Sequence, residues 1–303
     1  MTRSLLIPRV RIPIVEWLSP LFTSLSTQGS IFRRGFGLSF FFDKNPRIES
    51  FWQEVVVAEP THENMMEQLI DELSVFSIEC TEAQADLLIK DLELVIEKNK
   101  VVNLTRIVAL RDAVTLHLVD SLVPLGTKAF KPSNRLRFLD IGTGAGFPGI
   151  PLAIMTGMNG LFIDSVGKKV NAVNDFIDQL GLANCSAMSI RAEELALKEP
   201  ASFDYVTARA VAQSNVIIEY SAPLLKFGGQ LVLEKANLAE EELQNANFAS
   251  QVCGLTRVSR ETLELPRDLG HREILIYEKE HEPRIKLPRP NGTAKNHPLV
   301  PKR

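Results

Sequence analysis

The chain has 303 residues, of which 45% are hydrophobic and 23% are charged, and its formal net charge is −3 at pH 7. These values are ordinary for a globular protein, and the charge argues against a chain that coats nucleic acid over its whole surface, although it allows a local basic patch. No apolar run approaches the roughly 18–20 residues needed to span a bilayer. The three cysteines are far apart, which fits reduced thiols in a cytosol. We therefore expect a cytoplasmic protein that is not embedded in a membrane.

Residues 1–60 differ in composition from the rest of the chain. The first fifty residues contain seven basic and three acidic side chains and are rich in Ser and Phe. Such a start fits either an organellar transit peptide or a disordered or wrongly assigned extension ahead of a start near Met65 or Met66. We favour the second interpretation and leave this segment out of the fold prediction.

Residues 61–131 are predicted to form a helical cap. Apolar residues recur at spacings of three and four between Leu87 and Ile96, which indicates one buried helix face. Thr81 followed by Gln84 is a start signal for this helix. A second helix is expected over residues 109–122 from the same kind of repeat.

Residues 132–282 alternate short apolar runs with amphipathic stretches, which predicts a parallel sheet covered by helices on both faces. The expected strands are 136–141, 161–164, 187–190, 205–208 and 231–233, and the expected helices are 150–155, 168–180 and 214–225. Two further runs, 255–260 and 274–278, have no helix between them and would form an antiparallel hairpin at one end of the sheet. This pattern resembles the Rossmann-like α/β fold of class I S-adenosylmethionine-dependent methyltransferases, with its seven-stranded, mostly parallel sheet.

The most informative motif is a glycine loop after the first predicted strand, with Gly142, Gly144 and Gly146 at alternate positions. Such glycines let the backbone turn sharply and approach a ligand at the carboxyl end of a strand. A dinucleotide fingerprint that starts at Gly142 would need glycine where Phe147 stands. A dinucleotide site also needs free helix N–H groups for a pyrophosphate, whereas S-adenosylmethionine carries no phosphate. We therefore predict S-adenosyl-L-methionine rather than a nicotinamide as the cofactor.

Four further residues are expected at the same site. Asp164 ends the second strand, where a carboxylate can accept both ribose hydroxyls of an adenosine; capping the following helix is a compatible alternative. Ala192 and Glu193 follow the third strand, where the backbone and the carboxylate could face adenine. Arg209 ends the fourth strand and is interpreted either as a surface ion-pair partner or as a functional residue.

Together these motifs resemble the bacterial 16S ribosomal RNA guanine-N7 methyltransferases, the glucose-inhibited division protein B family. The resemblance covers nearly everything after Thr61. The motifs that carry it lie at residues 99, 103–105, 117–122, 142–149, 164–168, 191–194, 208–210 and 288–299. It implies cofactor contacts at Gly142, Phe147, Ala192, Glu193 and Arg209. It also implies methyl transfer to N7 of a guanine, with 16S ribosomal RNA or the small ribosomal subunit as the partner.

The chain departs from the family pattern at four positions. Lys98 stands where the family usually has tryptophan, Leu116 where it has arginine, Phe227 where it has proline, and Ala236 where it has glycine. Leu116 matters most, because it removes a possible phosphate contact.

Methyl transfer from a sulfonium is an in-line displacement, so orientation and exclusion of water would carry catalysis. Guanine N7 has a lone pair and no proton to lose, so no general base and no catalytic residue in that sense are expected. Phosphate binding needs positive charge. The basic tail, residues 283–303, contains no acid and supplies that charge with Arg284, Lys286, Arg289, Lys295, Lys302 and Arg303.

His117 and Lys235 are possible RNA contacts, although a lone histidine on a helix is more often structural. The five histidines show no metal-ligand spacing, so no metal is expected. Three alternatives stay open: a methyltransferase of another substrate, a nicotinamide-dependent oxidoreductase, and an RNA-binding relic without a donor site.

Overall fold

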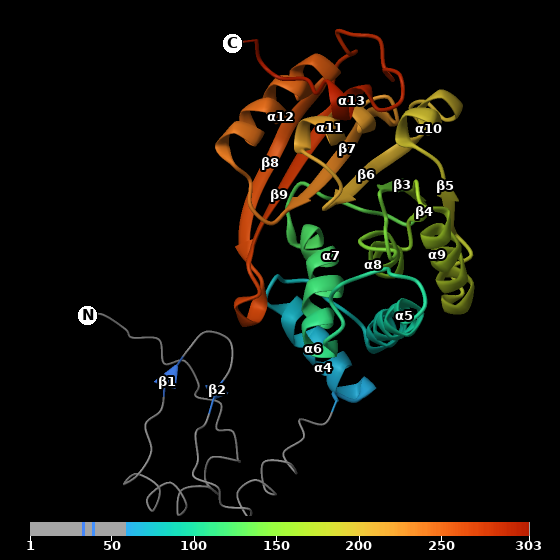
Figure 1. Cartoon of the computed structure of the whole chain (residues 1–303), viewed down its shortest axis with the longest axis vertical. Coiled ribbons are helices and arrows are strands. Elements are labelled where there is room, and N and C mark those ends of the chain that lie inside the picture. The colour runs from blue at the N-terminus through green and yellow to red at the C-terminus, as the bar shows by residue number, and fades with distance from the viewer. Residues whose placement is uncertain (1–31, 34–37, 40–58, 303) are drawn as a thin grey trace, which may run out of the picture. The chain divides into compact units, whose positions relative to one another are not determined.

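The computed structural model describes residues 32–33, 38–39 and 59–302 (Figure 1). The chain divides into two units, 1–58 and 59–303. In the first unit, β1 (Phe32–Arg33) pairs with β2 (Leu38–Ser39) in antiparallel fashion; the predicted N-terminal extension and both interpretations of it otherwise lie outside the described residues. Within the described part of the second unit, no helix is both long and apolar enough to cross a membrane.

A seven-stranded sheet forms the centre of the second unit, in the order β5-β4-β3-β6-β7-β9-β8. The strands are β3 (Arg137–Ile141), β4 (Asn159–Asp164), β5 (Cys185–Ser189), β6 (Phe203–Arg209), β7 (Leu225–Lys235), β8 (Leu255–Glu264) and β9 (His271–Lys279). The first five strands are parallel, and β9 is antiparallel to both β7 and β8. The predicted class I methyltransferase fold is confirmed, including the hairpin at one end of the sheet.

Successive residues of the central strands enter two different cores. On β3, Phe138 belongs to the core that contains α8 (Gly149–Thr156) and α9 (Gly167–Leu180), whereas Leu139 belongs to the opposite core. The helices of that second core are α10 (Ala192–Lys198), α11 (Ser214–Ser221) and α12 (Glu240–Cys253). Both faces of the sheet are therefore buried over its central strands, as the near-continuous apolar runs of those strands require.

Three helices beside the sheet differ from the prediction, and the first of them, α10, was not among the expected helices. The helix expected over 214–225 ends at Ser221, because the apolar residues near its predicted end lead into β7 instead. Helix α12 was not predicted. Its buried face consists mainly of small residues, which give a weak apolar period: Leu243, Ala246, Ala249, Ser250 and Cys253.

The cap packs against the core that contains α8 and α9. Helix α4 (His62–Ser74) precedes α5 (Glu82–Asn99), which begins at the predicted Thr81 cap with a complete Thr81–Gln84 capping box. The second predicted helix is present but interrupted. Its parts are α6 (Leu110–Ala113), a π-helical segment (Val114–Val119), α7 (Asp120–Leu122) and a 3-10 turn (Val123–Gly126). Wide π-helical turns of this kind are frequent at functional sites.

Candidate functional site

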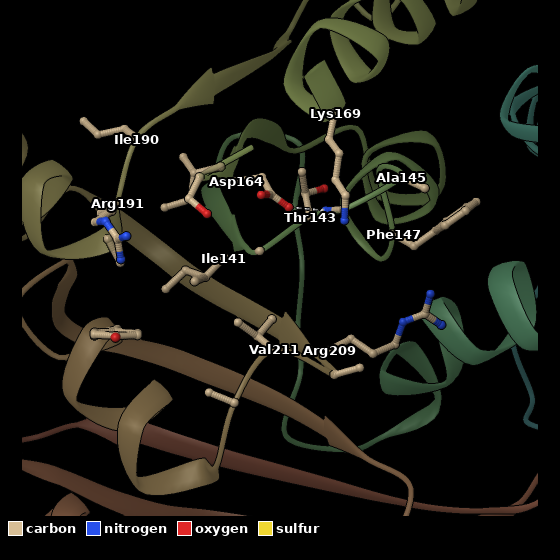
Figure 2. A pocket seen from close by; sticks show the side chains of 18 of the residues that line it. Ile141, Thr143, Ala145, Phe147, Asp164, Lys169, Ile190, Arg191, Arg209 and Val211 are labelled. Carbon is tan, nitrogen blue, oxygen red and sulfur yellow. Dashed lines mark hydrogen bonds between the residues drawn. The ribbon is translucent and has the colours of Figure 1, made fainter. Parts of the chain in front are cut away.

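A cavity of about 560 Å³ opens at the carboxyl ends of β3, β4 and β6. The chain leaves β3 toward one edge of the sheet and later returns to β6 on its other side, so the cavity lies at the topological switch point. The predicted site residues that line it are Gly142, Gly144, Phe147, Asp164, Ala192, Glu193, Arg209 and His117. Gly146 belongs to the same loop but is not among the lining residues, and neither is Lys235. In Figure 2, Ile190 and Arg191 lie at one end of the cavity, Phe147 and Arg209 at the other, and Asp164 between them.

Asp140 holds the glycine loop against the sheet. Its Oδ2 accepts a hydrogen bond from the N–H of Gly149 at 3.1 Å, and the Thr207 hydroxyl donates to Oδ1 at 3.3 Å. Burial raises the pKa of this carboxyl to about 6, although the hydrogen bonds oppose the shift. A Cβ on Gly149 would lie 2.7 Å from the Phe162 ring and 2.9 Å from Asp140 Oδ2, so only glycine lets α8 begin this close to the sheet. Pro148 is the residue immediately before α8.

The glycine loop itself has the backbone that its sequence predicts. Gly142, Gly144 and Gly146 have φ values of 72°, 61° and 102°, which lie in the region that side-chain-bearing residues rarely adopt. At Gly142 the space is also closed, since a Cβ would lie 2.6 Å from Cγ2 of Val211. The loop therefore presents its backbone to the cavity, and we call Gly142, Gly144 and Gly146 the glycine cradle. A side chain at position 142 would collide with Val211 in the cavity wall.

Asp164 binds main-chain groups on both sides. Its Oδ1 accepts from the N–H of Val166 at 2.9 Å, and its Oδ2 accepts from the N–H of Gly144 at 3.2 Å. The N-cap of α9 is Val166, without a side-chain capping hydrogen bond, so Asp164 does not cap this helix. A carboxylate has about four acceptor positions. Two of them fix the side chain at the cavity wall, and acceptor capacity is left for hydroxyl groups in the cavity.

Glu193 is held by the far end of the chain. The side chain lies in the first turn of α10, and the residue is 6% exposed. Its Oε1 accepts a hydrogen bond from the N–H of Gly292 at 3.0 Å. Tyr220 lines the cavity beside it; burial first, and then the charge of Glu193, raise the pKa of that phenol. This end of the cavity thus presents a fixed carboxylate and an aromatic hydroxyl.

The opposite end is built from stacked and paired side chains. The rings of Phe147 and His117 are parallel within 4° and 4.7 Å apart between centroids. The guanidinium of Arg209 lies 5.8 Å from the centre of the Phe147 ring, within the range of a cation–π contact. Burial, together with the charge of Arg209, lowers the pKa of His117 to about 4, so this imidazole is neutral at pH 7. Its Nε2 lies 3.0 Å from the hydroxyl of Thr105.

Arg209 is part of a buried ion pair rather than a surface one. Its Nη1 donates to Asp120 Oδ2 at 3.1 Å and to the carbonyl of Leu116 at 3.2 Å, and the two charged side chains are 14% and 8% exposed. Arg272 on β9 donates to the other oxygen of Asp120 at 2.6 Å. Glu234, which is paired with Arg209 in the sheet register, is fully buried, and burial raises its pKa well above the usual range.

The sequence matches the family described as rRNA small subunit methyltransferase G (GidB) over residues 84–270. Ribosomal RNA small subunit methyltransferase G of Staphylococcus epidermidis is 38% identical over 239 residues, which cover 78% of this chain and 98% of that protein. The protein of the same name from Staphylococcus aureus is 36% identical over 241 residues, which cover 78% and 99%. The chain belongs to this family. A solved structure of precorrin-6Y C5,15-methyltransferase from Geobacter metallireducens is 16% identical and covers 50% of this chain and 82% of that one, with a TM-score of 0.40.

Two of the four departures from the pattern of the small subunit methyltransferase G family have visible contacts. Lys98 Nζ pairs with Asp175 Oδ2 at 2.8 Å and links the cap to α9. Leu116 reaches Arg209 through its main-chain carbonyl, a contact that does not depend on the side chain at that position. Phe227 is exposed on β7; nothing in the structure explains Ala236.

Lys235 lies apart from the other predicted site residues. Its Nζ pairs with Glu242 Oε1 at 2.7 Å and donates to the carbonyl of Ala212 at 3.1 Å, and its side chain is 16% exposed. These contacts hold α12 to the end of β7. The RNA contact predicted for Lys235 therefore stays a prediction.

Several residues of the site were not predicted as such from the sequence. Lys169 in the first turn of α9, Tyr220 on α11 and Lys295 in the tail all line the cavity. Asp120 belongs to a cap motif of the family, which was the only available signal for it. Tyr220 had no signal, because one aromatic residue on a helix face is normally part of the core.

Proposed function

We propose that the cavity binds S-adenosylmethionine, and that the chain transfers its methyl group to N7 of a guanine in 16S ribosomal RNA. One observation carries the proposal: the glycine cradle and the two fixed carboxylates line a single cavity at the switch point, in a chain of the small subunit methyltransferase G family. The described residues fit the donor, since its adenosine has hydroxyl and amino donors for Asp164 and Glu193. The absence of a Cβ at position 142 lets the loop lie directly against Val211 in the cavity wall.

The proposed roles divide along the cavity. When bound, S-adenosylmethionine supplies an electrophilic methyl group on a sulfonium. Gly142 and Gly144 would face the donor through their backbone, Asp164 would accept the ribose hydroxyls, and Ala192 with Glu193 would contact adenine. Gly146 would shape the loop from behind.

Arg209 and the Phe147–His117 stack would position the acceptor base. Guanine presents O6 beside N7, and arginine donors are well suited to that edge. The observed contacts of Arg209 use one of its nitrogens, so donors are left for O6. N7 needs no deprotonation, which agrees with a His117 that stays neutral and takes up no second proton near pH 7. Orientation and exclusion of water would carry the rate acceleration.

The RNA would be bound outside the cavity by the cap and the tail. We assign residues 61–131 to the cap, 132–282 to the methyltransferase domain and 283–303 to a basic tail, with residues 1–60 as an extension. An unstacked RNA segment would present the guanine, and the basic residues near the cavity would contact its phosphates. His117 and Lys235 would be secondary contacts. A ribosomal RNA substrate supports a cytoplasmic site of action.

The test is transfer of labelled methyl from S-adenosylmethionine to small-subunit ribosomal RNA from cells that lack this protein, both as free RNA and as intact subunits. RNA from cells that contain the protein is the matched control. We expect label only in the first sample, recovered as 7-methylguanosine. Donor binding without transfer to either form would contradict the ribosomal assignment and leave a methyltransferase of another substrate.

A further inference from the structure

The C-terminal tail returns to the cavity after β9. Figure 1 shows its short helix α13 (Thr293–Asn296) lying against α11, with the preceding loop beside α10. Leu287 and Leu299 pack against the core that contains α10, α11 and α12. The match to the family model ends at residue 270, ahead of these contacts.

Two polar anchors fix the tail to the surface that surrounds α11. Arg289 binds the buried carboxylate of Glu219 through two nitrogens and also donates to the carbonyl of His297. Asn215 donates its amide to the carbonyl of Leu299 at 2.9 Å. Arg289 fixes the chain before α13, and the contact to Leu299 fixes it after α13. The segment between these two anchors therefore has a defined position.

That segment contacts the two acidic residues at the start of α10. Asn291 Nδ2 donates to Glu194 Oε1 at 2.6 Å, and the N–H of Gly292 donates to Glu193 Oε1 at 3.0 Å. Gly292 has a φ of 79°, a conformation that aims its N–H at Glu193 and that residues with side chains adopt only with strain. Three residues further on, Lys295 lines the cavity.

We propose that the C-terminal tail forms the adenosine-side wall of the donor site. Asn291 and Gly292 are positioning residues that hold the Glu193 carboxylate, and Lys295 contacts the bound donor. The inference rests on the proposed function and adds a segment that is distant in sequence from every motif of the donor site.

The physical reason is pre-organisation. A glutamate side chain has three rotatable bonds, and fixing it during binding costs free energy. The Gly292 N–H removes part of that cost before the ligand arrives. The Asn291–Glu194 contact fixes the peptide that carries this N–H, so a change at Asn291 reaches the ligand through Glu193.

The test measures binding of S-adenosylhomocysteine by calorimetry, which needs neither RNA nor turnover. Asn291→Asp places a second carboxylate against Glu194, and we expect the Kd to rise about tenfold, as loss of a pre-organised charged contact allows. Adding Glu194→Gln to Asn291→Asp restores a donor–acceptor pair and returns the Kd to within about threefold of wild type. In turnover, we expect Asn291→Asp to raise the KM for S-adenosylmethionine more than it lowers kcat, because the contact acts on donor binding.

Lys295→Ala is compared with Lys286→Ala, an exposed lysine on the same segment that does not line the cavity. We expect a weaker Kd for S-adenosylhomocysteine in the first variant alone. Equal effects of the two would indicate a general charge effect and overturn the role of Lys295. An unchanged Kd in Asn291→Asp, with normal binding by wild type, would overturn the proposal that the tail forms a wall of the donor site. It would leave the proposed function intact. No binding by wild type would remove the donor proposal, and this inference with it.

Discussion

The two ends of the cavity are held by different kinds of contact. From one end to the middle, the carboxylates of Glu193 and Asp164 accept hydrogen bonds from main-chain N–H groups. At the other, side chains hold one another: Phe147 stacks on His117, and Arg209 forms a buried ion pair. The first end depends on backbone conformation and the second on charge. Each end should therefore be sensitive to a different class of substitution.

The largest effect is expected at the charged end, in Asp120→Asn. The aspartate is shared by Arg209 and Arg272, and removing its charge leaves two buried guanidinium groups without their common partner. Breaking a buried ion pair from one side costs about 3–5 kcal/mol. We expect a loss of about 4 kcal/mol in the free energy of unfolding, measured by urea denaturation.

Asp112→Asn is the matched control for that substitution. Asp112 pairs with Arg267 at 2.6 Å, but both side chains are about two-fifths exposed, at 41% and 39%. An exposed pair contributes about 0–1 kcal/mol, so this variant should unfold almost as wild type does. Similar losses in the two variants would show that burial of the Asp120 cluster is not what makes it important.

The second effect is a change in the pH dependence of stability, seen in His117→Gln. The folded pKa of His117 is about 4, below its ordinary 6.5, because of burial and the nearby Arg209. Its contribution is therefore fully present above pH 6.5 and is lost as the pH falls through 4. Between pH 7 and pH 4, wild type should lose up to about 3 kcal/mol more unfolding free energy than the variant.

Asp140→Asn should show the opposite sign in the same pH-stability experiment. Burial raises the pKa of Asp140 from 3.8 to about 6, so its contribution is present below pH 3.8 and is lost as the pH rises through 6. Relative to this variant, wild type should become more stable as the pH falls from 7 to 4. Parallel curves for wild type and either variant would contradict the pKa assigned to that residue.

The third effect tests the backbone end, by binding of S-adenosylhomocysteine to Gly142→Ala. The added Cβ meets Val211 at 2.6 Å, and the residue is held at a φ of 72°. We expect binding about a hundredfold weaker, which corresponds to about 2.7 kcal/mol. Gly228→Ala is the control, because Gly228 has a φ of 77° and a Cβ there would have nothing within 4 Å. It should lose about 1–2 kcal/mol of stability through strain alone and keep its affinity.

The smallest effect is expected for Asp164→Asn, also measured by binding of S-adenosylhomocysteine. An amide keeps one acceptor oxygen but loses the charge and cannot accept from both Val166 and Gly144. We expect about tenfold weaker binding, or about 1.4 kcal/mol. Asp178→Asn, on the exposed face of α9, should bind normally; a loss in that variant too would indicate an effect of net charge.

The difference between local backbone contacts and contacts among distant side chains also explains what could be predicted from the sequence. The glycine loop, Asp164 and the capping box of α5 are local patterns, in which a few adjacent residues determine the geometry, and the strand–helix alternation reports burial directly. The Asp120–Arg209–Arg272 cluster joins residues from three distant elements, and no local pattern indicates such a pairing. The contact of Gly292 with Glu193 spans 99 positions and uses a main-chain donor, which leaves no trace in side-chain chemistry.

Two elements were missed for a related reason. Helix α12 buries small side chains, so its apolar period is weak although its packing is complete. The π-helical segment between Val114 and Val119 has an ordinary helical sequence, and its wider turn follows from contacts with the rest of the molecule. The spacing of apolar residues shows which face of a helix is buried. It says little about how closely neighbouring elements pack against that face.

The position of the tail has a consequence for the order of events during synthesis. A chain leaves the ribosome from its N-terminus, at about 5–20 residues per second. The glycine loop and Glu193 are made first, and Gly292 follows Glu193 by 99 positions. That separation corresponds to about 5–20 seconds of translation, during which Glu193 has no partner from the tail. The cavity wall is therefore completed late, after the loop that it faces has had time to fold.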